Sequence, residues 1–243
     1  MKRYELIVQG AEVVLPGAVL TLDVGVRGGR IAALGESLDP AEAAVVRDAS
    51  GLHLFPGMVD AHVHFNEPNF GHWEGFRSGS AALATGGCSS YIDMPLNGNP
   101  PTVTARALRQ KAELARGQSA VDYAFWGGLV PGNERELAPM AEAGAVAFKA
   151  FLSNPGGEGE GRFREVDDWT LYEGMGRIAE FGGLLALHAE SDGMTAALVE
   201  RMRAAGRGSA RDYAASRPPE AEDRKSTRLN SSHIQKSRMP SSA

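Results

Sequence analysis

Two histidines separated by one residue are the strongest chemical signal in the sequence. His62 and His64 lie in the stretch PGMVDAHVHFNEP, directly after a short apolar run. Because side chains two residues apart in a β-strand point to the same face, both imidazoles can reach one centre. Imidazole suits zinc and its first-row neighbours, and a catalytic site needs further ligands and an open position for water. The pair therefore indicates a metal site, with a histidine-capped surface strand as the structural alternative.

Lys149 and His188 are the residues best placed to supply further ligands. Lys149 lies in the apolar segment AVAFKAFL, where an ammonium group is costly to bury unless it is paired or modified. Either its charged end reaches solvent, or a neutral amine has reacted with carbon dioxide and the carbamate bridges two metal ions. His188 follows the apolar run LLAL. A lone histidine there is more often structural, but the HxH pair and the strand lysine favour a ligand.

Two aspartates are candidates to orient an imidazole by hydrogen bonding without binding metal themselves. Asp60 is two residues before His62 and on the same strand face. Asp93 ends the next apolar strand and either orients an imidazole or accepts a hydrogen bond from a backbone amide. We place His53 and His72 outside the metal-binding set.

The elements that must position these residues alternate between strand and helix from Leu54 onward. Five short apolar, strand-like segments are each followed by a segment with helical periodicity. We expect the helices at residues 73–85, 105–116, 134–143, 168–181 and 193–205. Such alternation with short connections is typical of parallel strands with right-handed crossovers, either in a doubly wound sheet or in a (β/α)8 barrel.

The positions of the polar residues favour the barrel. The candidate ligands and Asp93 lie at or near the carboxyl ends of the predicted strands, and in a barrel these ends converge on one mouth. No GxGxxG motif follows the first strand, which disfavours a dinucleotide-binding sheet. A complete barrel has eight strands and five are recognisable here. The predicted fold class is therefore α/β, a partial (β/α)8 barrel.

Three segments follow from the changes in pattern along the chain. Residues 1–53 contain short strands and a turn at Gly28 and Gly29, which predicts a small antiparallel sheet or part of a β-sandwich. Residues 54–222 form the incomplete barrel. Residues 223–243 carry five of the 25 basic residues and one of the 30 acidic ones, without apolar periodicity. We expect that tail to be non-native or disordered, with the native sequence interrupted near Glu222.

Composition limits the partners. The net charge of −5 argues against nucleic acid as a partner, and no apolar run is long enough to cross a bilayer. The first residues show no secretory leader, and the single cysteine, Cys88, excludes an internal disulfide and a multi-cysteine metal site. We expect a cytoplasmic protein without a nucleic-acid or membrane partner.

Six ordered motifs carry a family resemblance. PGMVDAHVHFNEP, HWEGF, YIDMPLNGNPPT, FKAFLSNP, LHAE and SRPPEAE together resemble the cyclic amidohydrolases of the amidohydrolase superfamily, from about Glu5 to Glu222. The resemblance implies a (β/α)8 barrel with an accessory β-sandwich and two divalent metal ions, usually zinc. It implies that His62 and His64 bind one metal, that Lys149 as its carbamate bridges both, and that His188 binds the second.

The same resemblance implies features beyond this chain. A histidine from the sixth strand and an aspartate from the eighth, the general acid and base, complete the site in the family. Both are expected C-terminal to the residues present, so we expect the 243-residue chain alone to be an inactive fragment. Intact members are often homotetramers.

Substrate choice depends on two asparagines. Asn97 matches a position near the substrate in this family, although Asn-Gly is also a common turn. Dihydroorotase-type members carry an arginine two residues beyond the second histidine, suited to a substrate carboxylate, and Asn66 stands there instead. A neutral cyclic amide is therefore favoured, most closely as in the members that open the hydantoin ring of allantoin in purine catabolism. Hydrolysis of the dihydropyrimidinase or hydantoinase type is the alternative, and a non-catalytic scaffold relative is the alternative from another class.

Overall fold

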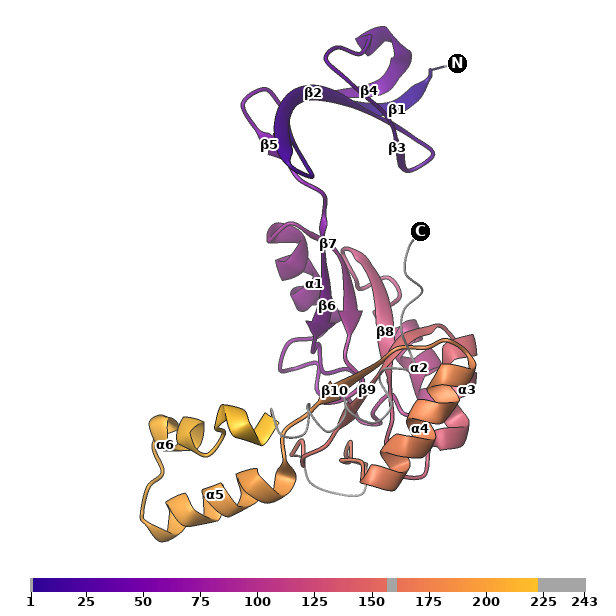
Figure 1. The fold of residues 1–243 in the computed structure, drawn as a ribbon. Helices are drawn as coiled ribbons and strands as arrows, with labels where there is room; N and C mark the ends of the chain where they lie inside the picture. The colour runs from indigo at the N-terminus through magenta and orange to yellow at the C-terminus, as the bar shows by residue number, and fades with distance from the viewer. Residues whose placement is uncertain (1, 157–160, 223–243) are drawn as a thin grey trace. The chain divides into compact units, whose positions relative to one another are not determined.

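The chain divides into two compact units. The computed structural model describes residues 2–156 and 161–222, and its ribbon is drawn in Figure 1. One unit is Met1–Met58 and the other begins at Val59, a few residues after the division predicted at residue 53. The predicted non-native tail, residues 223–243, lies outside the described residues. Within the described ranges, no helix is long and apolar enough to cross a membrane.

The first unit is built on one five-stranded sheet. Its strands are β1 (Tyr4–Leu15), β2 (Ala18–Arg27), β3 (Arg30–Gly35), β4 (Ala43–Asp48) and β5 (His53–Leu54). The predicted turn at Gly28 and Gly29 joins β2 to β3, and both glycines have positive φ, at 60° and 68°. The pairing is mixed rather than purely antiparallel. The reason is that β1 pairs with β2 antiparallel along one edge and with β4 and β5 in parallel along the other.

A proline separates the two sheets. The segment HLFPGMVDAHVHF does not form one strand: β5 pairs with β1 in the first sheet, and a new strand, β6 (Met58–Val63), starts the second. Pro56 lacks a backbone N–H and Gly57 weakens a strand, so the extended segment is interrupted at that point. His53 accordingly belongs to a strand of the first sheet and not to the HxH strand.

The second unit contains the five predicted strands in sequential order. After β6 they are β7 (Cys88–Asp93), β8 (Asp122–Gly128), β9 (Ala145–Phe151) and β10 (Leu185–His188). The sheet order is β10-β9-β8-β7-β6, and the pairs from β7 to β10 are parallel. A doubly wound sheet reverses its strand order at a switch point, whereas each strand here is added beside the previous one. The sheet is therefore the curled half of a (β/α)8 barrel, as predicted.

Helices follow the strands close to the predicted residues. They are α1 (Phe76–Thr85), α2 (Ala105–Ala115), α3 (Leu137–Glu142), α4 (Asp168–Glu180), α5 (Asp192–Ala204) and α6 (Ala210–Ala215). Helix α1 starts after Gly75, whose φ of 81° is not helical, and not at residue 73. The predicted helix 134–143 divides into a 3-10 turn, Glu134–Glu136, and α3, because Pro139 has no N–H to continue an α-helical ladder. Helix α6 was not among the predicted helices.

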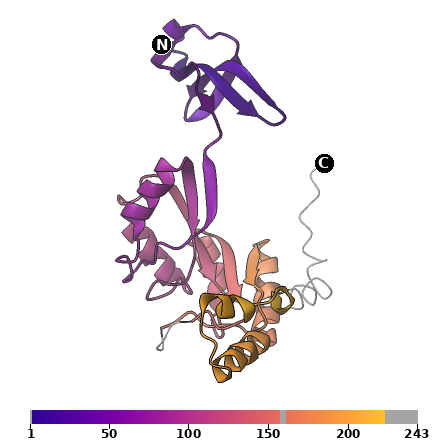
Figure 2. The same ribbon diagram turned by 90° about the vertical axis from the view of Figure 1, so that its left-hand side faces the viewer.

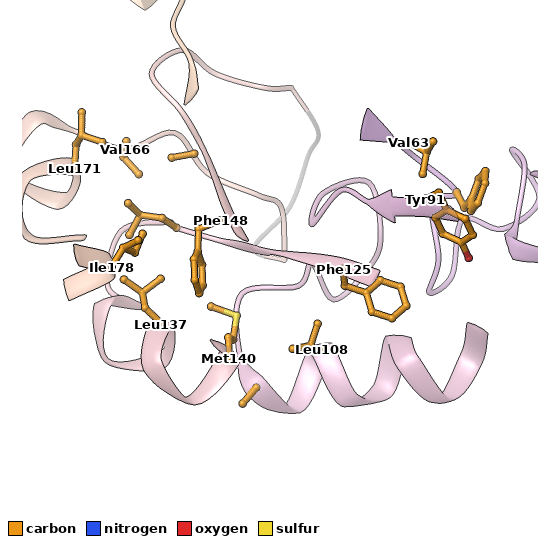
Figure 3. Packing of buried hydrophobic residues seen from close by; sticks show 14 of the residues in the cluster. Val63, Tyr91, Leu108, Phe125, Leu137, Met140, Phe148, Val166, Leu171 and Ile178 are labelled. Atoms are coloured by element: carbon orange, nitrogen blue, oxygen red, sulfur yellow. The ribbon is translucent and has the colours of Figure 1, made fainter. Parts of the chain in front are cut away.

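The main core lies between the sheet and the helices. Helix α1 contacts β7, α2 contacts β8 and α3 contacts β9, and α1 lies beside the β6 and β7 end of the sheet in both views (Figure 1 and Figure 2). Figure 3 shows Leu108 and Met140 directed from their helices toward Phe125 and Phe148 of the sheet. Because strand side chains alternate, Lys149, next to Phe148, faces the opposite side of the sheet.

That opposite side has its own apolar layer and is the inner face of the half-barrel. Trp126, Ala147 and Phe163 belong to it, and Phe151 packs against it. The Trp126 indole Nε1–H donates to the carbonyl oxygen of Ala61, 2.9 Å away, and so ties β8 to β6 across this face. By strand alternation, the candidate ligands belong to this inner face.

Candidate metal centre

His62 and His64 lie together at the end of β6. Val63 between them belongs to the core against the helices, so alternation directs both imidazoles to the inner face. Their ring centroids are 5.3 Å apart. Nδ1 of His64 is buried and has no hydrogen-bond partner among the described residues. Burial, and then the charge of His62, lower the pKa of His64 to about 4, so at neutral pH it is the neutral imidazole that metals bind.

Lys149 is a buried amine on β9. The residue is 6% exposed, and its Nζ lies 5.2 Å from the centroid of the Phe151 ring. Burial lowers the pKa of the amine, while the charge of Glu222 opposes that shift. Within residues 2–156 and 161–222 no carboxylate lies at ion-pair distance from Nζ. The structure thus favours a buried amine with a lowered pKa over a charged end that reaches solvent.

His188 is on the same face of the sheet as Lys149. Lys149 is the register partner of Ala186, and His188 is two residues further along β10. The His188 ring stacks on Phe151, with centroids 4.8 Å apart and planes 20° from parallel. Phe151 therefore contacts both Lys149 and His188, which brings the ends of β9 and β10 to one place.

The structure places the four predicted ligands in two local groups. His62 and His64 lie side by side, and His188 and Lys149 both contact the Phe151 ring. The buried, unpartnered Nδ1 of His64 and the lowered pKa of Lys149 fit metal ligation. In the described part of the chain, however, no three His, Cys, Asp or Glu side chains are grouped closely enough to hold a metal ion. The metal-binding roles of these residues remain predictions.

Asp60 and Asp93 both hold backbone amides. Asp60 Oδ1 accepts from the N–H of His62 at 3.0 Å, and Asp93 Oδ1 accepts from the N–H of Phe65 at 2.8 Å. Of the two roles considered for Asp93, the structure gives the backbone one. Asp93 therefore supports the backbone directly after His64 instead of contacting an imidazole.

A buried ion pair beside the histidines was missed from the sequence. Lys111 of α2 pairs with Asp93, and both side chains are 1% exposed. Its Nζ also donates to the carbonyl oxygen of Met94 at 2.7 Å. The available signal was spacing, because Lys111 follows Leu108 by three residues and precedes Ala115 by four, on the apolar face of the helix.

Asn66 and Asn97 lie in two loops that pack on each other. The loop after β7 passes so close to the loop after β6 that a Cβ on Gly98 would lie 2.6 Å from the Glu67 carbonyl oxygen. Both asparagines have left-handed backbones, with φ of 64° and 66°. Oδ1 of Asn66 is buried and unpartnered among the described residues, whereas Asn97 is exposed. A substrate contact through Asn97 remains a prediction.

Comparison with known proteins decides the family. Residues 53–221 match the family model described as "Amidohydrolase family". The chain belongs to the amidohydrolase family. This amidohydrolase is 51% identical over 219 residues to an allantoinase of Bacillus velezensis, covering 90% of this chain and 47% of the relative. It is 49% identical over 218 residues to an allantoinase of Solibacter usitatus, with 90% and 47% covered.

Solved structures agree with the half-barrel. An L-hydantoinase (dihydropyrimidinase) from Arthrobacter aurescens superposes with a TM-score of 0.85 at 33% identity, covering 93% of this amidohydrolase and 49% of that chain. A D-hydantoinase superposes with a TM-score of 0.79 at 26% identity, covering 92% and 48%. The chain spans about half the length of the curated relatives it matches. Amidohydrolases generally depend on two bound metal ions.

Proposed function

We propose that the whole protein hydrolyses a cyclic amide in a metal-dependent reaction, with allantoin as substrate and allantoate as product. The observation that carries the proposal is the 51% identity to an allantoinase across 90% of this chain. The position of His64, whose pKa is lowered, and of Lys149, a buried amine whose pKa is also lowered, at the carboxyl ends of barrel strands supports it. Carboxyl strand ends are where active sites of this fold are built.

The four predicted ligands have a proposed division of roles. His62 and His64 would hold one divalent cation, His188 would hold a second, and Lys149 as its carbamate would bind both, with zinc as the proposed metal. When bound, two such ions supply an activated water and polarise the amide carbonyl. Overall, water adds its oxygen to the carbonyl carbon, the ring C–N bond breaks, and the leaving nitrogen takes a proton.

Lys149 must first be converted to the carbamate. Its neutral amine attacks carbon dioxide, a nitrogen–carbon bond forms, and one N–H proton leaves to solvent. Burial favours this step because it lowers the pKa of the amine and so raises the fraction of the neutral nucleophile at pH 7. The product is an anion that binds cations, which compensates its own burial.

Asn66 supports the choice of a neutral substrate. The Oδ1 atom of Asn66 is unpartnered and could accept a hydrogen bond from a ring N–H, whereas the amide provides no charge for a carboxylate. The superposition on an L-hydantoinase favours a second candidate, the hydantoinase or dihydropyrimidinase reaction. We rank it below allantoin hydrolysis because the sequence identity is 33% there and 51% to an allantoinase.

A substrate panel tests the proposal. We expect the purified whole protein to hydrolyse allantoin with a kcat/KM about 10-fold or more above that for hydantoin and dihydrouracil. The reason is that a single favourable contact to the substrate is worth about 1–3 kcal/mol. Dihydroorotate is expected to be poorest. Initial rates of ring opening measured on all four compounds check this. Preference for dihydrouracil would replace the proposal by the second candidate, and no turnover with two metals bound would favour a scaffold protein.

Location and assembly are proposals of the same kind. A free, buried Cys88 and the absence of other cysteines in the sequence support a reducing, cytoplasmic location. A homotetramer is supported by the family resemblance alone.

A further inference from the structure

His188 is held at one of its two ring nitrogens. Its Nε2 lies 2.8 Å from Oε2 of Glu190, two residues along the chain. An ionised carboxylate only accepts, so Nε2 of a neutral imidazole carries the proton in this bond and Nδ1 keeps its lone pair. The hydrogen bond to Glu190 determines which way the two ring nitrogens of His188 point. Stacking on Phe151 fixes the orientation of the ring plane.

Glu190 is itself held from further along the chain. Its second oxygen, Oε1, lies 3.7 Å from Nε of Arg217. The Arg217 guanidinium lies over the Tyr213 ring, 4.8 Å from the centroid, and donates to Oγ of Ser216 at 3.0 Å. The side chains of Glu190 and Arg217 are 22% and 28% exposed, so solvent screens this pair less than it screens the surface ion pairs.

The segment that carries Arg217 is docked on the loop after β10. The Ser191 N–H donates to the carbonyl oxygen of Ala221 at 2.8 Å, and Ser216 and Ala221 are each 1% exposed. The motif SRPPEAE therefore has a structural role that the proposed reaction does not account for. It places an arginine behind the glutamate of the LHAE motif.

We propose that Glu190 is a positioning residue for His188 and that Arg217 holds Glu190 in place, so that Nδ1 of His188 faces the centre beside Lys149. The inference rests on the proposed function in one respect, the assignment of a metal ion to that nitrogen. Ligating histidines commonly donate their other ring N–H to a carboxylate, which fixes the tautomer and raises ligand basicity. Glu190 has this relation to His188, whereas Asp60 and Asp93 contact backbone amides.

The tautomer of His188 is the direct test and needs no metal. We expect nitrogen-15 NMR of the metal-free 243-residue chain at neutral pH to show His188 with its proton on Nε2. In the Glu190→Ala variant we expect a mixture of the two tautomers. A wild-type His188 protonated on Nδ1 would overturn the proposal whatever the variants do.

Metal affinity is the second test, in the whole protein. We expect Glu190→Ala to weaken zinc binding at the weaker of the two sites by about 10- to 100-fold, the usual cost of losing such a partner. Arg217→Met is expected to have a smaller effect in the same direction. Glu200→Gln, which removes an exposed partner of Arg203, is the matched control and is expected to leave affinity unchanged. Wild-type affinity in both Glu190→Ala and Arg217→Met would contradict the proposal.

The two proposals fail separately. If the protein binds metal through His188 but does not hydrolyse allantoin, the tautomer and affinity results still stand and only the proposed function falls. If allantoin is hydrolysed and Glu190→Ala has wild-type tautomer and affinity, only the positioning role falls.

Discussion

Replacing Lys149 with methionine is expected to lower kcat/KM for allantoin in the whole protein by more than about 100-fold, because loss of a partner outside the metal sphere alone costs about 10- to 100-fold. Methionine fills a similar buried volume without an amine, so neither carbamate nor bridging ligand can form. The metal content is expected to fall from two ions per chain to one or none. Allantoate production and elemental analysis of the same samples measure both effects.

Folding and chemical rescue are the controls for Lys149. The residue is 6% exposed and has no carboxylate partner in the described residues, so Lys149→Met is expected to fold as stably as the wild type or better. Short carboxylic acids added to Lys149→Ala are expected to restore part of the activity by occupying the vacated space. A Lys149→Met protein with two metal ions and wild-type turnover would rule out the carbamate.

Replacing Lys111 with methionine is expected to destabilise the folded chain by about 3–5 kcal/mol, because it leaves the Asp93 carboxylate buried without a counter-charge. Asp93 also holds the Phe65 amide directly after His64, so the loss is expected to loosen the end of β6. Urea unfolding followed by circular dichroism gives the free energy of unfolding.

Two comparisons make the Lys111 result specific. The double variant Lys111→Met with Asp93→Asn is expected to recover most of the loss, since an amide oxygen still accepts from Phe65 and no charge is buried. Arg116→Met removes an exposed ion pair with Glu113 and is expected to cost less than about 1 kcal/mol. A cost for Lys111→Met no larger than that for Arg116→Met would contradict the importance assigned to the buried pair.

The half-barrel and the candidate ligands were predictable because both depend on local patterns. Apolar strands alternating with helical segments indicate parallel pairing, and strand ends in a barrel face one mouth. The sequence therefore places four candidate ligands at one mouth: His62, His64, Lys149 and His188. In the structure His62 and His64 lie together, and Phe151 contacts both Lys149 and His188.

Features that depend on contacts distant in sequence were not predictable in the same way. The pairing of β4 and β5 with β1, the Lys111–Asp93 ion pair and the Glu190–Arg217 contact each join residues whose neighbours along the chain carry little information about the partner. Two local interruptions of regular structure could have been predicted from the sequence. Pro56 divides an extended segment and Pro139 divides a predicted helix, because neither residue has an N–H for the ladder.

Removal and return of metal is the most direct test of a two-metal cyclic amidohydrolase built on these strand ends. The purified whole protein is stripped with a chelator, and allantoate formation is measured before and after titration with zinc. We expect activity to fall by at least about 100-fold and to return as the second equivalent per chain is bound, since both ions act on the substrate and the attacking water. Undiminished allantoin hydrolysis by the metal-free protein, or no hydrolysis with two zinc ions bound, would contradict it.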